Sequence, residues 1–538
     1  MNLDLRRRLS WPFAFAVLFF LIAPLLVYLH PSSFWVGLDY NPLGLADALN
    51  LAYRIADLRL YPAPGMWDHP GVPFYFMSWL ALAFTGYPVA SGSGFLDAVV
   101  GHIETYHRLC IWLAALAGAV GVYVFARAAQ KLVPNGVVII GLLIWLVSSP
   151  ATLTQFTSPS IDSFAIVANS LFFVILVRLA YDEDVKPRVA LLCGCVGAFA
   201  YLNKLSYIYI PFALAVAGFA NAAFRDIGWI RVRRLTAYFT LGYLSVLVAV
   251  GVFIIGSSGF LRLLRFHRSV ILGAGLYGTG DRVVVSGDEI WRAVAAIPVD
   301  KAYAIVIALL VGPYLVIGGL IAGRKGPQHT PAAVISIGTG LASALSAVFV
   351  MKHYGFHYTA GVSATLPACV VACCLLARSF GYSLRIVATT LAAMAILFMA
   401  SQAWPLIISG LVAETNRTQL AEADLREIRA QLSGSKDAVE FSYRAPFSWY
   451  GEGFVVAYAS VPRLNDDYIR SRQEMFGSMA AGLIGREPGA YVIDKAYFPT
   501  VESVKAASNV APFGPKPVTF GDDDKLIELR TVFLLIRG

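Results

Sequence analysis

Charged residues are scarce in this sequence. Only 14% of its 538 residues are Asp, Glu, Lys or Arg, whereas 58% are hydrophobic, and the mean hydropathy is +0.67. Soluble globular domains usually contain about 25% charged residues, so this composition excludes a wholly water-soluble chain. The sequence therefore predicts an α-helical polytopic membrane protein.

Cysteine and histidine are also scarce, with 6 and 8 copies. The cysteines lie within apolar runs, and no nearby histidines complete a metal-ligand spacing, so we interpret them as packing residues. The basic residues give a net charge of +9 and fall in short loops between apolar runs. Membrane insertion explains that distribution, so nucleic acid is not an expected partner.

Long apolar runs are what the sequence has in abundance. Runs of about 20 apolar residues, enough to cross the hydrocarbon core, recur from Trp11 to Trp404. The first run lacks a small-residue cleavage pattern, so we expect a retained span rather than a signal peptide. We expect a transmembrane domain over residues 1–411 and a soluble domain over residues 412–538.

The second domain is expected to be a small α/β unit. It opens with AETNRTQLAEADLREIRAQLSG, whose apolar spacing predicts an amphipathic helix. FVVAYAS, YVIDKAY and LIELRTVFLLI read as strands, with a helical stretch over residues 468–476. It contains no recognisable catalytic set, and docking of an acceptor or bracing is its expected role.

The basic loops fix the expected orientation. Lys and Arg concentrate on the cytoplasmic side, so the arginines at positions 6–8 place the N-terminus inside. If residues 72–84 lie on the outer surface rather than crossing, all later basic loops also fall inside. This choice gives roughly eleven spans, an extracytoplasmic C-terminal domain, an outer loop over residues 30–106 with interfacial helices, and an outer loop over residues 257–301.

Chemically suggestive residues gather on that outer side. The stretch WDHPG carries Asp68 and His69, SPSIDS carries Asp162, and YLNKLS carries Lys204. A helix cap alone would explain Asp162, and a lysine that reaches from a span to the surface would explain Lys204. The turn MKHYGFHYTAG adds Lys352, His357 and Tyr358, of which interfacial aromatics explain only the tyrosine.

The outer loop at residues 257–301 contains an arginine cluster. FLRLLRFHRS carries Arg262, Arg265 and Arg268 on the side where the positive-inside rule does not place them. Arginine binds phosphate oxygens through paired hydrogen bonds, so a phosphate is the expected partner. The following GAGLYGTG matches a dinucleotide pattern, but neither a strand nor a helix-forming run flanks it, so we interpret it as a flexible loop.

The order of these stretches resembles the GT-C glycosyltransferases that use polyprenyl-phosphate sugars. It is most similar to the branch containing protein O-mannosyltransferases and the lipid A aminoarabinose transferase. The resemblance covers Trp11 to Trp404 and implies a GT-C membrane domain with a catalytic aspartate in the first outer loop. Asp39 matches that acid better than Asp47 because of its distance from the Pro62 turn.

The same resemblance implies roles for further residues. Asp162 matches the second outer acid, Arg108 the arginine opening the next span, and Pro70 the proline before an interfacial helix. Lys204 matches the family's lysine, and His357 with Tyr358 matches its late His-Tyr turn. Tyr40 stands where many relatives have a second acid, and His69 replaces a basic residue. These departures weaken a paired-carboxylate metal site, leave a divalent metal open, and place one donor-phosphate contact in doubt.

The expected reaction is inverting transfer of a sugar from a polyprenyl-phosphate donor to a lipid, glycan or protein acceptor. Asp39 would be the base and Asp162 a second catalytic acid, while Asp68, His69, Tyr358 and Arg108 would form the rim of the substrate groove. The expected phosphate-binding residues are Lys204, Arg262, Arg265, Arg268, Lys352 and His357.

The expected location is a bacterial inner membrane. Three alternatives remain from the sequence: a polymerase or ligase for glycans linked to polyprenyl diphosphate, a secondary transporter with ionisable residues at mid-membrane, and a non-catalytic membrane scaffold, which would leave the outer arginines unexplained.

Overall fold

The computed structural model describes residues 11–29, 73, 77, 103–147, 164–182, 186–251, 257–273, 286–300, 302–352, 354–355 and 358–384. Farther along the chain it describes residues 386–387, 389–390, 393, 420, 423–424, 426–428, 430–432, 439–441, 476–477, 489–495, 498–506 and 521–538.

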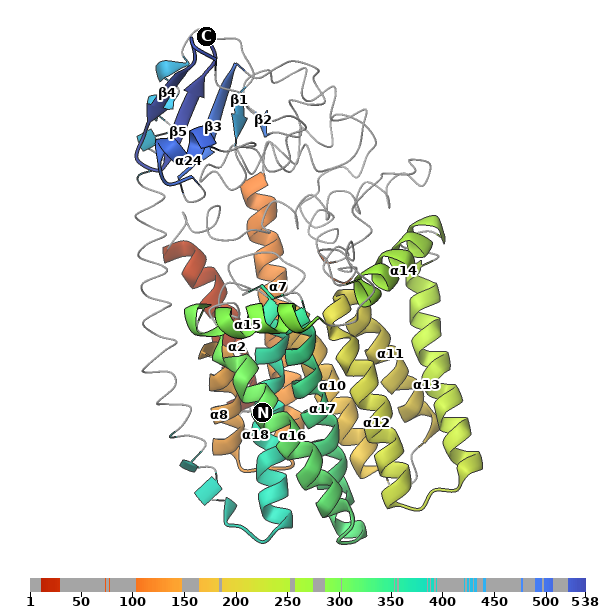
Figure 1. Ribbon diagram of the computed structural model, residues 1–538. Helices are drawn as coiled ribbons and strands as arrows, with labels where there is room; N and C mark the ends of the chain where they lie inside the picture. Colours follow the sequence, from red (N-terminus) through yellow and green to blue (C-terminus); the bar gives the residue numbers. More distant parts are fainter. Residues whose placement is uncertain are drawn as a thin grey trace, which may run out of the picture.

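The apolar runs form a helical bundle, which is the lower part of the molecule in Figure 1. Within the described residues, five helices are long and apolar enough to cross a membrane: Trp112–Ala129 within α7 (Ile103–Ala129), Leu205–Phe224 with α12 (Tyr209–Phe224), α16 (Tyr303–Gly323), Pro327–Lys352 with α17 (Thr330–Lys352), and α18 (Thr359–Ser379). The neighbouring helices are α2 (Trp11–Leu29), α8 (Asn135–Val147), α10 (Ala165–Tyr181), α11 (Pro187–Asn203) and α13 (Trp229–Ala249). The total of about eleven crossing helices stays a prediction.

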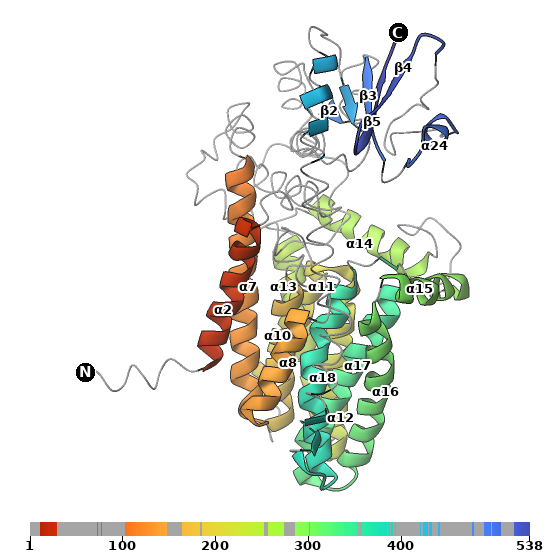
Figure 2. The same ribbon diagram turned by 90° about the vertical axis from the view of Figure 1, so that its left-hand side faces the viewer.

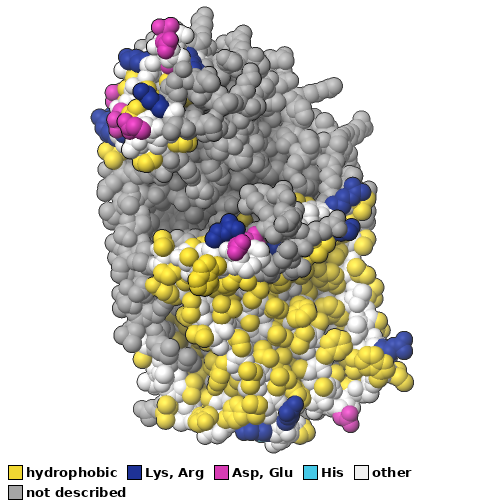
Figure 3. Space-filling model, in the orientation of Figure 1, with side chains coloured by type: hydrophobic (Ala, Val, Ile, Leu, Met, Phe, Trp, Pro, Cys, Tyr) yellow, Lys and Arg dark blue, Asp and Glu magenta, His cyan; other side chains and the backbone are white. Residues whose placement is uncertain are grey.

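The basic connections between these helices share one end of the bundle. The α7–α8, α10–α11, α12–α13 and α16–α17 connections all lie at the end away from the C-terminal sheet (Figures 1 and 2). The described basic residues of these connections and of the helix turns beside them include Arg127, Lys131, Lys186, Arg188, Arg225, Arg231, Arg324 and Lys325. Figure 3 shows a broad apolar band on one face, with Lys and Arg side chains above and below it. This is the charge distribution expected of a protein that crosses a bilayer.

Two glycines let α11 and α13 pack closely. A Cβ atom on Gly194 would lie 2.0 Å from the carbonyl oxygen of Phe239, and one on Gly242 would lie 2.2 Å from that of Leu191. Helices in membranes use small residues where their backbones approach in this way. The contact fixes α11, and with it the position of Lys204 directly after the last residue of that helix.

The predicted outer loop over residues 257–301 contains two described helices, and its place on the outer side of the membrane stays a prediction. Helix α14 (Ser257–Leu272) and helix α15 (Gly287–Asp300) both lie at the end of the bundle nearest the sheet (Figures 1 and 2). On α14, Leu263 and His267 are buried at helical spacing. Helix α15 begins with a capping interaction in which the Glu289 amide donates to the Ser286 hydroxyl at 3.2 Å. Residues 274–285, which hold most of the glycine-rich stretch, lie outside the described residues.

The predicted surface helix over residues 72–84 is described at two positions. Pro73 and Met77 are both helical. Met77 is buried in an apolar cluster with Ala114 of α7, Leu202 of α11 and Leu263 of α14. This segment therefore contacts the end of the bundle where α11 and α14 meet.

A mixed sheet forms the C-terminal part of the chain. Its strand order is β2 (Phe476–Gly477), β1 (Val439–Phe441), β3 (Ala490–Asp494), β5 (Val532–Ile536) and β4 (Lys525–Glu528). β1 pairs in parallel with β2 and β3, whereas β5 pairs antiparallel with β3 and β4. One short helix, α24 (Val501–Ala506), contributes Val504 to the apolar cluster on this sheet.

The strand predictions in this domain were partly right. YVIDKAY contains most of β3, but LIELRTVFLLI forms two strands, β4 and β5, joined by a turn. Phe476 is in β2 rather than at the end of a helix. FVVAYAS and residues 468–475 lie outside the described residues.

A buried carboxylate attaches the predicted amphipathic helix to this sheet. The described residues between 420 and 431 are helical, and the Asp424 side chain among them is fully buried. Its carboxylate accepts hydrogen bonds from the Arg530 amide at 3.0 Å, the Arg530 guanidinium at 3.1 Å, the Thr531 amide at 2.5 Å and the Thr531 hydroxyl at 2.7 Å. These bonds hold the turn between β4 and β5 against the helix.

Asp424→Asn is therefore expected to loosen the C-terminal domain. The amide nitrogen of Asn donates, so it would face backbone amides that also donate, and charge-assisted hydrogen bonds worth about 1.5–3 kcal/mol each would be lost. We expect hydrogen-exchange protection at the Thr531 amide to fall by roughly 30-fold or more, the equivalent of about 2 kcal/mol. Asp522→Asn is the matched control because Asp522 is exposed on the same domain. Unchanged protection in Asp424→Asn would contradict the prediction.

Candidate functional site

Lys204 lies where two helices of the bundle meet. It follows the last residue of α11 with an extended backbone (φ −157°, ψ 136°), and a short 3₁₀ turn, Leu205–Ile208, leads from it into α12. Its amide donates to the Ala200 carbonyl at 3.1 Å, and its carbonyl accepts from the Tyr207 amide at 2.9 Å. The residue is only 6% exposed. A buried lysine at the edge of an apolar bundle marks a functional candidate, because burial of an ammonium group is costly.

The Lys204 ammonium contacts an aromatic ring from the other predicted stretch. Its Nζ lies 4.3 Å from the centroid of the Tyr358 ring, and Tyr358 precedes the first residue of α18. A cation over a ring face is stabilised by about 0.5–2 kcal/mol. The structure therefore brings together two predicted site residues that are far apart in the sequence.

Lys352 contacts the arginine-bearing helix. It is the last residue of α17, and its Nζ donates to the carbonyl oxygens of Val270 at 2.8 Å and Ile271 at 2.6 Å. Both carbonyls belong to the last turn of α14. A cation there binds carbonyls that have no partner within the helix, and it interacts favourably with the negative end of the helix dipole. Phosphate binding by Lys352 stays a prediction, and its described hydrogen bonds are those of a cap on the last turn of α14.

A second contact fixes the middle of α14. The Tyr201 hydroxyl and Nδ1 of His267 form a short hydrogen bond, and the two rings meet edge to face with centroids 5.0 Å apart. Tyr201 lies in the last turn of α11, three residues before Lys204, and His267 is buried. Together, Lys352 and His267 hold α14 beside the end of α11.

The structure describes the side chains of two of the three predicted arginines of α14. Arg265 and Arg268 lie three residues apart, so they share one side of α14, and both are exposed, whereas His267 is buried. Arg262 is also in α14 and Arg108 is in α7, but their side chains lie outside the described residues. The described lysines and arginines at this end include Lys204 directly after α11, Lys352 of α17, Arg265 and Arg268 of α14, and Arg292 of α15.

Five predicted site residues lie outside the described residues: Asp39, Asp68, His69, Asp162 and His357. Their roles, including that of Asp39 as the base, stay predictions. Residues 43–59, whose apolar residues at helical spacing predict one of the interfacial helices of the first outer loop, also lie outside the described residues. Within the described residues, no group of three or more His, Cys, Asp or Glu side chains could hold a metal ion.

Asn203 is a buried polar residue that sequence reasoning missed. It precedes Lys204, its side chain is fully buried, and neither Oδ1 nor Nδ2 has a hydrogen-bond partner among the described residues. A buried amide of this kind is costly unless something satisfies it. Its helical spacing from Ala200 and Val196, both in the main core cluster, places it on the core face of α11. A polar residue at an otherwise apolar core position was the available sequence signal.

Asn169 forms a separate polar contact in the core. Its Nδ2 donates to the Ala165 carbonyl at 2.9 Å, and its amide exchanges hydrogen bonds with the Tyr209 hydroxyl at 3.1 and 3.2 Å. The Tyr209 hydroxyl also donates to the Gly361 carbonyl at 3.3 Å. This network ties the first turns of α10, α12 and α18 together, so it holds in place the helix starts around Lys204 and Tyr358.

Comparisons with known proteins give one distant likeness. No protein-family model and no curated protein matches the sequence. Among solved structures, the chain is similar to the crystal structure of ArnT from Cupriavidus metallidurans bound to undecaprenyl phosphate. The two chains share 14% identity over 97% of this chain and 98% of that chain, with a TM-score of 0.46. A likeness this distant assigns neither a fold family nor an activity to this chain.

Proposed function

We propose that this protein is a membrane glycosyltransferase of the GT-C type, which moves a sugar from a polyprenyl-phosphate donor to an acceptor. The observation that carries the proposal is the cationic cluster at one end of the bundle. Lys204 is buried there against Tyr358, and α14 places Arg265 and Arg268 at the same end. The resemblance of the motif order to the GT-C enzymes supports the same function.

The reaction requires few catalytic groups. The donor expels a phosphate, which is already a good leaving group, so no general acid is needed. One base removes the proton from the acceptor hydroxyl as it attacks the anomeric carbon, and attack from the face opposite the phosphate inverts the configuration. We assign the base to Asp39, with Asp162 as a second acid nearby.

The cations act on the leaving group. Negative charge grows on the phosphate as the bond to the sugar breaks, and donors already in place stabilise that charge most strongly where water is scarce. Lys204 is the best placed of these donors because it is buried, whereas Arg265 and Arg268 are exposed and can contact the phosphate from the α14 side. Lys352 acts indirectly because it holds the last turn of α14.

The buried amide of Asn203 adds a second kind of contact. A phosphate only accepts hydrogen bonds at neutral pH, whereas an amide both donates and accepts. A sugar hydroxyl matches both atoms of the amide. We therefore assign Asn203 to the sugar and Lys204 to the phosphate.

The reacting groups belong at the outer surface under this proposal. The basic loops at the other end would face the cytoplasm of a bacterial cell, and the C-terminal sheet would lie outside it. The isoprenoid chain would lie in the bilayer beside the bundle. Asp68, His69, Arg108 and Tyr358 would form the rim, and the acceptor would be a lipid, a glycan or a protein.

The distribution of charge disfavours a secondary transporter. A transporter places ionisable residues near mid-membrane. In the bundle helices, the described Lys, Arg, Asp and Glu residues lie within the first or last two turns. The described ionisable groups are thus at the ends of the bundle, where they can meet a lipid head group.

The proposal is tested by offering the purified, membrane-reconstituted protein a panel of polyprenyl-phosphate sugars. Sugars lacking one hydroxyl are included because Asn203 is assigned to a hydroxyl. We expect one sugar to be consumed with release of polyprenyl phosphate, and one of its deoxy analogues to react more slowly. Release of polyprenyl diphosphate from diphosphate-linked glycans would indicate a ligase or polymerase instead. A folded protein that consumes no donor in the panel would contradict the proposal.

A further inference from the structure

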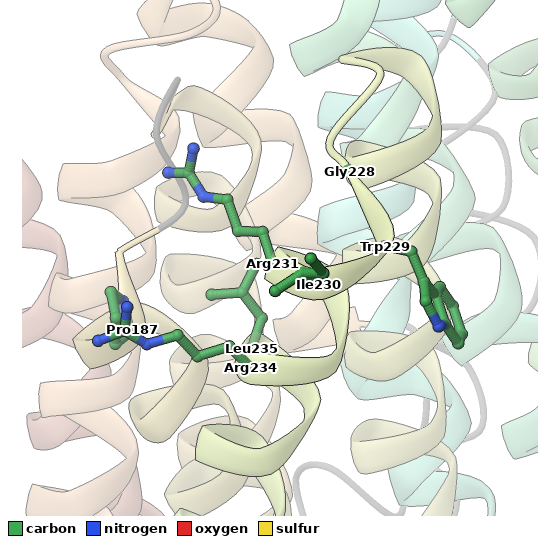
Figure 4. Close-up of a pocket in the computed structure, with 7 residues that line it drawn as sticks. All are labelled: Pro187, Gly228, Trp229, Ile230, Arg231, Arg234 and Leu235. Atoms are coloured by element: carbon green, nitrogen blue, oxygen red, sulfur yellow. The ribbon is translucent and has the colours of Figure 1, made fainter.

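A pocket lies at the end of the bundle opposite Lys204. It has a volume of about 730 Å³ and lies between the first residue of α11 and the first two turns of α13 (Figure 4). Its lining combines two arginines with apolar and aromatic residues: Pro187, Gly228, Trp229, Ile230, Arg231, Arg234 and Leu235. Because it opens at the end with the basic loops, it is separate from the candidate site described above.

The two arginines approach the pocket from the same side of α13. Arg231 and Arg234 are one helical turn apart, and in Figure 4 both extend toward the Pro187 side, whereas Trp229 lies on the other side of the helix. Both arginines are exposed. Nearby in the sequence, Arg188 and Arg233 add positive charge and Asp182, Glu183, Asp184 and Asp226 add negative charge. The Asp182 carboxylate accepts a hydrogen bond from the Lys186 amide at 3.1 Å. The charge and geometry of this lining suit a phosphate group.

The apolar residues around the pocket indicate the level of the membrane surface. Trp229 is 70% exposed and Ile230 is 85% exposed at the start of α13. Exposed tryptophan at the end of a membrane helix is typical of the interface, where its ring meets the head groups. The pocket therefore lies at head-group depth rather than in bulk water.

An exposed apolar stripe leads from the pocket along α13. Leu241 and Val248 follow Arg234 at seven-residue intervals, so all three share one face of the helix, and Leu244 lies between them. All three apolar residues are large exposed hydrophobics. An acyl chain can lie along this stripe while its head group occupies the pocket. The stripe favours a lipid over a free phosphate ion, because a phosphate ion has no apolar part that could contact it.

We propose that this pocket binds the phosphate of an anionic phospholipid in the leaflet on this side of the membrane. Arg231 and Arg234 hold the phosphate oxygens, and Trp229 and Ile230 rest among the neighbouring head groups. The acyl chains run along Leu241, Leu244 and Val248. Basic pockets between membrane helices on the cytoplasmic side favour anionic over zwitterionic lipids. The lipid bridges α11 and α13 at the end distant from the reaction.

The test uses the full-length protein in detergent, with thermal unfolding followed during titration with phosphatidylglycerol. Arg231→Gln combined with Arg234→Gln is compared with Arg127→Gln combined with Lys131→Gln. The control pair lies at the same end, in the last turn of α7 and the turn that follows it, is exposed and removes the same charge, but it lies outside the pocket. We expect phosphatidylglycerol to bind the pocket variant roughly 30-fold more weakly than the wild type, and the control almost as tightly.

The alternatives give different results. Equal weakening in both double variants would show general attraction to basic loops and would overturn the proposal. An equal shift with phosphatidylcholine would overturn recognition of an anionic lipid, and an equal shift with inorganic phosphate would overturn the assignment to a lipid. If the double variant does not fold, Arg234→Gln alone serves, because the described contact of Arg234 is only with the Tyr238 ring, 5.9 Å away. Wild-type affinity in that variant would also overturn the proposal.

Discussion

Lys204→Met is expected to lower the rate of sugar transfer by about 100- to 1,000-fold, as loss of a preorganised electrostatic group does in other enzymes. Methionine keeps much of the length of the side chain and packs well against an aromatic ring, so contact with Tyr358 can persist without the charge. The fold should therefore survive while stabilisation of the leaving phosphate is lost. The measurement is release of polyprenyl phosphate by reconstituted protein, at saturating donor.

Lys325→Met is a closely matched control for this prediction. The Lys325 ammonium lies 4.0 Å from the centroid of the Phe380 ring, so it makes the same kind of contact as Lys204. It lies two residues after the end of α16, in the connection to α17, at the opposite end of the bundle from Lys204 (Figure 2). We expect this variant to transfer sugar at nearly the wild-type rate. If Lys204→Met transferred sugar at the wild-type rate, the assignment of Lys204 to the phosphate site would be wrong.

The sequence predicted the large divisions of the molecule because hydropathy and charge are local properties. The position of the bundle and the shared end of the basic connections follow from runs of apolar residues and from the lysines and arginines between them. The first apolar run is helical as α2. The predicted outer loop at residues 257–301 also contains a local signal for one of its helices. Ser286 and Glu289 have the spacing of a helix cap, and the Glu289 amide donates to the Ser286 hydroxyl at the start of α15.

Contacts between distant residues could not be predicted from a single sequence. The hydrogen bonds of Lys352 to α14 join residues about eighty positions apart, and the Tyr201–His267 pair joins residues 66 positions apart. Both sets of contacts involve residues that sequence alone favours as ligands or surface groups. Asp424 is a similar case, because an acid on an amphipathic helix usually faces water, whereas here it binds a turn 106 residues later.

One predicted strand forms two strands for a related reason, a contact between residues that are distant in the sequence. LIELRTVFLLI contains no Gly, Pro, Asn or Asp to mark a turn. The chain nevertheless turns at Arg530 and Thr531, because the Asp424 carboxylate binds both of their backbone amides. A turn stabilised from outside its own sequence has no local signature.

Asp39→Asn is expected to reduce transfer by about 100- to 10,000-fold, the contribution typical of a general base. Asparagine has nearly the same shape as aspartate but cannot accept a proton at neutral pH, so donor binding should change little. The prediction rests on the sequence, since Asp39 lies outside the described residues. The loss should appear in the maximal rate more than in the donor concentration needed to reach half of it.

Asp47→Asn tests whether the effect of Asp39→Asn is specific to Asp39 or is shared by another acid of the same outer loop. Asp47 lies on the predicted amphipathic helix over residues 43–59, where a solvated helix face explains an acid without catalysis. Both variants remove one negative charge from this loop, so a general electrostatic effect would weaken them equally. We expect Asp47→Asn to retain nearly full transfer, with both variants present in the membrane at wild-type levels. If Asp47→Asn were inactive and Asp39→Asn active, the base would be Asp47, and the spacing argument from the Pro62 turn would be wrong.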